Sequence, residues 1–159
     1  LAENIQTNKK NRDFEKMKRI GKWTKEAGIE VRAGFLVGLP GETPKLAKET
    51  IQTAIELDPD YAQFTVCCPY PGTKLANEIH EGKWGKFITH NLKDYNMWKV
   101  TWLPFGYKNS EELKNMERYA FRKFYLRPSY VLRRILAIRS FEDIKRYIKG
   151  GRALVKGFL

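Results

Sequence analysis

The sequence predicts an α/β fold: a partial TIM-like (β/α) barrel fragment with parallel strands and a C-terminal α-helical extension. Residues 29–67 have the pattern strand, glycine-containing turn, helix, strand, which is typical of a parallel βαβ unit. Each strand runs into a special turn, GLPGET after the first and PYPGT after the second, as strands do at the active rim of a β/α barrel. Helical spacing of apolar residues returns after position 110 and predicts the extension.

The first half of the chain alternates helix and strand. Residues 12–27 carry apolar side chains at helical spacing. The interior of 29–37 is almost wholly apolar, as expected for a strand buried on both faces. Thr43 is a suitable cap for the helix expected over 44–57, and Pro44 suits its first position.

The second strand, 61–67, has two contrasting faces because successive side chains of a strand point in opposite directions. The apolar face, which we expect to pack under the helices, consists of Ala62, Phe64 and Val66. The more polar face consists of Gln63, Thr65 and Cys67. If that face points into the barrel, it suits a pocket for a substrate or for an adenosyl group.

After the second turn, Thr73 is positioned to cap a short helix over 74–80. Residues 81–109 have no clear period and are expected to form a long loop with one short strand near 99–102. Long structured loops are often functional. The loop's large aromatic residues either line a pocket for an apolar substrate or anchor the loop in the core, and both interpretations are open for Trp84, Trp98, Trp102 and Tyr107.

The last part of the chain is predicted to be helical. A core stripe runs through 111–127, and two shorter helices are expected over 130–139 and 141–148. Ser-Phe-Glu-Asp at 140–143 resembles a capping box in which aspartate replaces the usual glutamate. Gly150-Gly151 is expected to close this part.

The positive charge is concentrated in the tail. The chain of 159 residues has a net charge of +12, of which residues 118–159 contribute +10, with twelve Lys and Arg against two Asp and Glu. Solvated helix faces are the default interpretation, followed by peripheral membrane contact, because aliphatic residues alternate with arginines over 131–139. An RNA-binding patch ranks below lipid because no base-stacking motif is visible, so we do not expect a nucleic-acid partner.

Composition narrows the class of protein. There is no apolar run long enough to span a membrane and no signal-peptide pattern. The first residue is Leu1, so we expect the chain to begin inside a longer protein. Cys67 and Cys68 are adjacent and poorly placed to pair, which favours a reducing, cytoplasmic setting. Two cysteines and two histidines without metal-like spacing predict no metal site formed by this chain alone.

Two sequence runs, GFLVGLPGET and ELDPDYAQFTVCCPYPGTKL, resemble the C-terminal half of radical S-adenosylmethionine (radical SAM) enzymes. The likeness is closest to the subgroup with an N-terminal cobalamin-binding domain, which includes anaerobic ring cyclases and hopanoid-pathway enzymes. LAENIQTNKK resembles the segment after the fourth barrel strand, and RKFYLRPSYVLRRI and KGGRALVKGFL resemble the helical extension of these proteins. The resemblance divides the chain into 1–109, the C-terminal part of the barrel, and 110–159, the basic helical extension.

The resemblance implies three cofactors: S-adenosylmethionine, a [4Fe–4S] cluster and, in this subgroup, cobalamin. The family binds its cluster through a Cys-x-x-x-Cys-x-x-Cys loop, which is absent from this sequence. We therefore expect the cluster ligands and any cobalamin domain to lie outside this chain, in the missing N-terminal part of the same protein. The chain alone should then be inactive.

The resemblance also suggests binding residues. Leu36 corresponds to the apolar residue that packs on the adenine of S-adenosylmethionine, and Gly38 to the strand end whose backbone hydrogen-bonds the edge of the ring. Thr65 and Cys67, which lie on the polar face of the second strand, are expected from the alternation of its side chains to contact the same cofactor. Glu42 falls one residue later than in the family pattern, so it either stabilises the helix start or contacts substrate.

No residue is assigned a catalytic role. Cys67 or Cys68 either donates a hydrogen atom to a substrate radical or is simply a small buried residue. His80 and His90 are isolated, and surface or packing roles are expected for them.

Three functions are open for this sequence. The first is a radical SAM enzyme that acts on an organic substrate, such as a lipid or tetrapyrrole, by cobalamin-dependent methylation or by cyclisation. The second is a tRNA-modifying enzyme similar to methylthiotransferases, which normally end in a small RNA-binding β-barrel. The third is a non-catalytic basic barrel module that binds RNA or anionic lipid.

Overall fold

The structure is a computed structural model that describes residues 14–96, 99–138 and 140–158. Its elements are α1 (Phe14–Glu26), β1 (Arg32–Val37), α2 (Pro44–Leu57), β2 (Tyr61–Val66), α3 (Lys74–His80), β3 (Gly85–Phe87), η1 (Leu92–Asp94), β4 (Trp102–Pro104), α4 (Ser110–Tyr125), α5 (Pro128–Leu136) and α6 (Phe141–Phe158). Within these ranges, no helix is both long and apolar enough to cross a bilayer.

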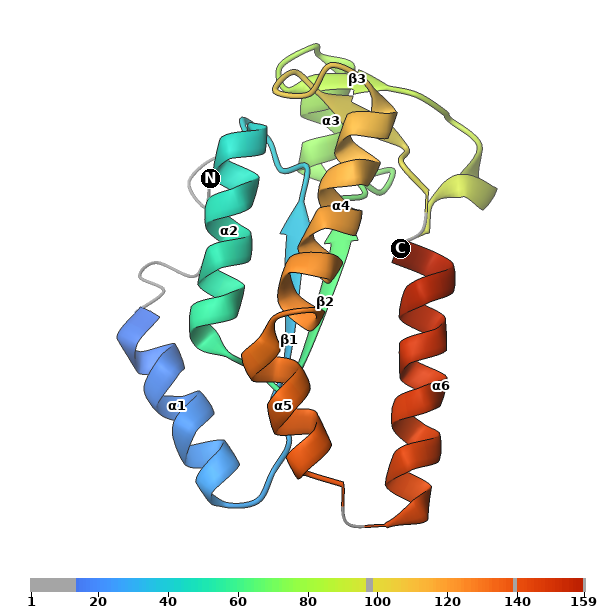
Figure 1. Cartoon of the computed structure of the whole chain (residues 1–159). Coiled ribbons are helices and arrows are strands. Elements are labelled where there is room, and N and C mark those ends of the chain that lie inside the picture. Colours follow the sequence, from blue (N-terminus) through green and yellow to red (C-terminus); the bar gives the residue numbers. More distant parts are fainter. Residues whose placement is uncertain (1–13, 97–98, 139, 159) are drawn as a thin grey trace.

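The centre of the fold is a parallel pair of strands (Figure 1). β1 and β2 pair over their full length, from Arg32 opposite Tyr61 to Val37 opposite Val66, and α2 forms the crossover between them. The predicted parallel βαβ unit is confirmed. The described residues form an α/β fold with a two-stranded parallel sheet, and the partial barrel stays a prediction.

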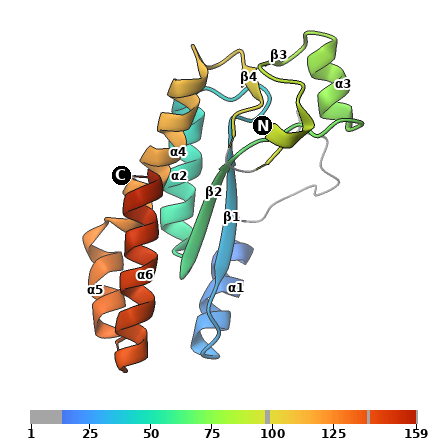
Figure 2. The ribbon, with the colours of Figure 1, turned by 90° about the vertical axis from the view of Figure 1, so that its right-hand side faces the viewer.

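One face of this sheet is covered by helices. α2 and α4 lie side by side on it, as the two views in Figures 1 and 2 agree, and both contact β1 or β2. Apolar side chains of the strands and these helices form the main core, whose fully buried members include Val37, Ile51, Phe64, Leu113 and Phe124. The boundary expected between 109 and 110 stays a prediction, although α4 shares this core with the βαβ unit.

The opposite face of the sheet is open within the described part of the chain. Side chains alternate along β1, and the exposed ones are Arg32 and Leu36, with Gly34 between them. The prediction that β1 is buried on both faces is therefore wrong for this structure. The physical reason is that only one layer of described helices packs on the sheet.

Short-range capping explains where the helices start. The Thr43 hydroxyl accepts from the Leu46 N–H at 3.4 Å, and Thr73 accepts from the Ala76 N–H at 3.2 Å, as predicted. Ser140 and Asp143 form the expected reciprocal box: the Asp143 N–H donates to the Ser140 hydroxyl, and the Ser140 N–H donates to the Asp143 carboxylate.

Two predicted details of the second half are wrong. The loop contains an antiparallel hairpin of β3 and β4, whereas the sequence predicts one short strand near 99–102. Strands of three residues are too short to leave a periodic pattern. α6 also continues through Gly150 and Gly151 to Phe158, because glycine weakens a helix by only about 1 kcal/mol per residue.

Candidate functional site

The candidate site lies where the two parallel strands end. Leu36 on β1 stands directly opposite Thr65 on β2, and both belong to the open face of the sheet. The Leu36 side chain is 45% exposed although it is aliphatic and paired within the sheet, next to the last residue of β1. Two of the four predicted binding residues are thus neighbours on an accessible surface.

The backbone of Leu36 faces the strand edge away from β2. The Val37 carbonyl accepts the Cys67 N–H at 2.8 Å, so the polar groups of Val37 point toward β2. Because backbone groups alternate in direction along a strand, the N–H and C=O of Leu36 point the other way. A planar ligand packed on the Leu36 side chain would find these two groups beside it.

Gly38 forms the sharp turn that follows β1. It adopts a φ of +74°, which favours glycine, and a Cβ there would lie 2.9 Å from Leu113 Cδ1. Its N–H donates to Glu42 Oε1 at 2.6 Å. That N–H is therefore already engaged within the protein, which leaves Leu36 as the better backbone partner for a ligand.

Glu42 has a role that the sequence did not reveal. Its side chain is completely buried, and Oε1 also accepts the Tyr107 hydroxyl at 2.6 Å. Burial raises the pKa of the Glu42 carboxyl, although the hydrogen bonds from Tyr107 and Gly38 oppose this effect. Glu42 thus joins the turn after β1 to Tyr107 through buried hydrogen bonds, rather than acting as a helix-start carboxylate or an exposed substrate contact.

A second contact fastens the same turn to the loop before α4. Gly106 packs so closely on the Glu42 backbone that a Cβ at this position would lie 1.8 Å from the Glu42 carbonyl oxygen. We call Gly38, Glu42, Gly106 and Tyr107 the turn–loop latch. It fixes the end of β1 against a segment more than sixty residues away in the chain.

The loop aromatics anchor the loop in the core where the structure describes them. Trp102 is fully buried, and its Nε1 donates to the Cys67 carbonyl at 2.8 Å. Trp84 Nε1 donates to Glu78 at 2.9 Å, and Tyr107 belongs to the main core. Trp98 lies outside the described residues.

The adjacent cysteines have different surroundings. The Cys67 side chain is buried beside Ile79 and Trp102 rather than displayed on the open face, and burial, with smaller effects of Cys68 and Glu42, raises its pKa to about 12. Cys68 is half-buried, with its Sγ 3.6 Å from Thr101 Oγ1. Roles for either thiol in cofactor binding or hydrogen transfer stay predictions.

The two histidines take part in packing. The rings of His80 and His90 stack with centroids 5.7 Å apart, and both rings contact Phe87. In the described ranges, no group of three or more His, Cys, Asp or Glu is arranged to hold a metal ion.

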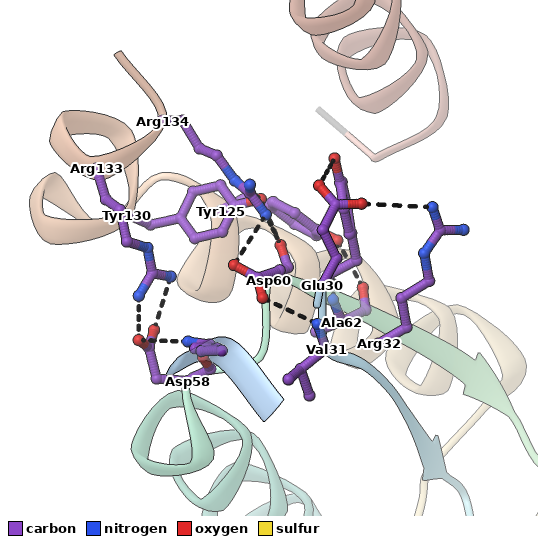
Figure 3. Close-up of polar contacts among 12 residues, drawn as sticks. Glu30, Val31, Arg32, Asp58, Asp60, Ala62, Tyr125, Tyr130, Arg133 and Arg134 are labelled. Atoms are coloured by element: carbon purple, nitrogen blue, oxygen red, sulfur yellow. Dashed lines mark hydrogen bonds and ion pairs between the residues drawn. The ribbon is translucent and has the colours of Figure 1, made fainter. Parts of the chain in front are cut away.

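Cations of the extension turn inward at the opposite end of the sheet (Figure 3). Asp58, which follows α2, accepts hydrogen bonds from Lys25, Arg127 and Arg133, while Arg134 bonds the Asp60 carbonyl. The Tyr130 hydroxyl also donates to that carbonyl at 3.0 Å. We call these residues the Asp58–Asp60 cluster. The default interpretation of the tail as solvated helix faces is therefore wrong for the arginines of α5.

No protein-family profile matches the chain. The chain is 37% identical over 134 residues, 81% of its length, to an uncharacterized methyltransferase of Pyrococcus horikoshii, of which it covers 27%. The N-terminal run LAENIQTNKK, which carries part of the predicted resemblance, lies outside the described residues.

Two further similar proteins carry the name anaerobic magnesium-protoporphyrin IX monomethyl ester cyclase. The chain is 28% identical over 123 residues to that of Rubrivivax gelatinosus, matching 77% of the chain and 21% of the cyclase. It is 28% identical over 103 residues to that of Cereibacter sphaeroides, matching 65% of the chain and 16% of the cyclase. The chain therefore spans about a quarter or less of each relative's length.

Proposed function

We propose that this chain is the part of a radical SAM enzyme that holds the adenosyl end of S-adenosylmethionine. The single observation that carries the proposal is the parallel pairing of β1 and β2, which brings GLPGET and PYPGT to the same edge of one sheet. The names of the relatives, a methyltransferase and two cyclases, agree with chemistry that uses this cofactor.

The residues at the strand ends fit an adenosyl group. Leu36 offers an accessible apolar surface beside its own backbone N–H and C=O, and Thr65 offers a hydroxyl next to it. Adenine needs such a combination, an apolar platform with a few polar groups at the edge. The turn–loop latch would hold this platform in place, and the bound cofactor would supply the radical chemistry.

The residues present do not fit an iron–sulfur cluster. The chain has two cysteines, and the Cys67 thiol is buried with a pKa of about 12. Three accessible thiolates are required to ligate such a cluster and leave one iron open. We therefore propose that the cluster ligands lie elsewhere in the protein. The residues that bind any cobalamin are proposed to lie elsewhere as well, and no residue of this chain is assigned to it.

We propose a large organic substrate, such as a tetrapyrrole or lipid, that undergoes methylation or cyclisation. Support comes from the two cyclases, whose name specifies a magnesium-protoporphyrin ester. The share of this chain in the reaction is to orient the cofactor and to exclude water from the side of the adenosyl group that packs on Leu36.

The test is anaerobic reconstitution of the natural full-length protein with iron, sulfide and S-adenosylmethionine, followed by reduction with dithionite. We expect 5′-deoxyadenosine to accumulate, as measured by liquid chromatography with mass detection. A reconstituted protein that neither binds S-adenosylmethionine nor forms 5′-deoxyadenosine would contradict the proposal and favour a non-catalytic basic module.

A further inference from the structure

Helix α5 directs its charged side chains toward the protein and its aliphatic side chains outward, which is the reverse of an ordinary surface helix. Its inward side carries Tyr130, Arg133 and Arg134, which all belong to the Asp58–Asp60 cluster (Figure 3). Surface helices normally bury their apolar stripe and expose their charges. In α5 the two arginines bond to Asp58 and Asp60, so the outward side of the helix carries neither of them.

The outward side of α5 is aliphatic and accessible. Its exposed residues are Val131 (41%), Leu132 (59%), Ile135 (57%) and Leu136 (74%). These positions fall on one side of the helix, opposite the arginines, at the spacing of an amphipathic stripe. Such an uncharged, exposed stripe typically marks a contact surface.

More exposed apolar residues gather at the same end of the molecule. α5 runs away from the candidate site and α6 runs back toward it, so the end of α5 and the start of α6 lie at the same end of the molecule (Figures 1 and 2). α6 begins with Phe141, which is 71% exposed. α1 ends at this end too, and its Trp23 is 58% exposed. We call Leu132, Ile135, Leu136 and Phe141 the tip surface.

The charge around the tip surface indicates what covers it. Residues 118–159 contain twelve Lys and Arg, of which Arg127, Arg133 and Arg134 bond within the Asp58–Asp60 cluster. The other nine cations face two acidic residues in this segment, and α6 displays exposed Lys145, Lys149 and Arg152 on neighbouring positions. A second copy of this chain would bring the same excess of positive charge, which opposes self-association. An anionic lipid surface complements both the cations and the apolar side chains.

We propose that the tip surface is a peripheral membrane contact that inserts its aliphatic and aromatic side chains among anionic phospholipids. The candidate site lies at the opposite end of the strands, so attachment would leave it facing away from the bilayer surface. This inference does not depend on the proposed radical chemistry, because it concerns a different end of the fold.

The experiment is flotation of the natural full-length protein with two kinds of vesicle. One consists of phosphatidylcholine alone, and the other of equal parts phosphatidylcholine and phosphatidylglycerol. We expect flotation with the anionic vesicles only, and we expect the double variant Leu136→Ser/Phe141→Ser to bind them at least ~10-fold more weakly, because two large apolar side chains are lost.

A matched control is Leu92→Ser/Phe105→Ser, which removes two residues that are each 69% exposed at the other end of the molecule. This control should float like the wild type. No flotation of the wild type, or equal flotation of the tip and control variants, would overturn the proposal. If instead the tip variant converts a dimer into a monomer in sedimentation, the surface is an interface between copies and the proposal is wrong.

Discussion

Replacing Gly106 by alanine is expected to lower the free energy of unfolding by at least ~3 kcal/mol. The added Cβ would lie 1.8 Å from the Glu42 carbonyl oxygen and 2.9 Å from its carbonyl carbon. Both are backbone atoms, so no side-chain rotation relieves the overlap. The loop has to move, which breaks the hydrogen bond between Tyr107 and Glu42 and leaves the buried carboxyl with one partner fewer.

Chemical denaturation of Gly106→Ala measures this loss. Gly21→Ala is the matched control, because a Cβ there meets nothing within 4 Å and α1 accepts alanine readily. The control is expected to retain or slightly increase stability. Equal stability of Gly106→Ala and the wild type would show that the turn–loop latch is not formed.

The second large effect is expected for Asp58→Asn. The Asp58 carboxylate forms ion pairs with Lys25, Arg127 and Arg133. The uncharged amide of asparagine would leave these three cations near one another without their shared anion. The Asp58 side chain is 39% exposed, and water screens part of this loss, so we expect about 1–3 kcal/mol. Asp58 also has a φ of 45°, which asparagine tolerates, so the variant isolates the effect of charge.

Lowering the pH should weaken the same ion pairs of Asp58. Burial acts to raise the pKa of Asp58, but Arg133, Lys25 and Arg127 outweigh it and hold that pKa below its ordinary value of 3.8. The stabilisation is therefore present above the unfolded-state pKa and is lost as the pH falls through the folded-state pKa. Thermal unfolding between pH 6 and about pH 3 should show a smaller acid-induced loss in Asp58→Asn than in the wild type.

Glu142→Gln serves as the control for this prediction, because Glu142 and Lys145 form an exposed pair on α6. It should unfold like the wild type at every pH. If Asp58→Asn shows the same pH dependence as the wild type, the cluster does not stabilise the fold.

Much of the βαβ unit was predictable because its signals are local. Thr43 and Pro44 mark the start of α2 within one turn of the chain, and alternation along β2 identifies Ala62, Phe64 and Val66 as the buried side. The same alternation places Thr65 on the opposite, more polar face, whereas the apolar run of β1 predicts burial on both faces and so does not indicate that Leu36 is exposed.

The contacts that hold the site were not predictable because they join distant segments. Nothing in the sequence near Glu42 indicates that Tyr107 will donate to it, and the close approach of Gly106 depends on the path of a loop without periodicity. The arginines of α5 seemed to face solvent because sequence patterns show amphipathicity but not which side turns inward. The positions of Asp58 and Asp60 decide that.

The most direct measurement of the central claim is the affinity of the full-length protein for S-adenosylmethionine when Leu36 is replaced by aspartate. Isothermal titration would compare it with Ile88→Asp, a control in which a residue of nearly equal exposure, 46% against 45%, carries the same new charge outside the parallel sheet, directly after β3. We expect Leu36→Asp to weaken binding at least ~10-fold, because an apolar platform becomes a solvated carboxylate, and Ile88→Asp to bind like the wild type. Equal affinities for the wild type and Leu36→Asp would contradict the account.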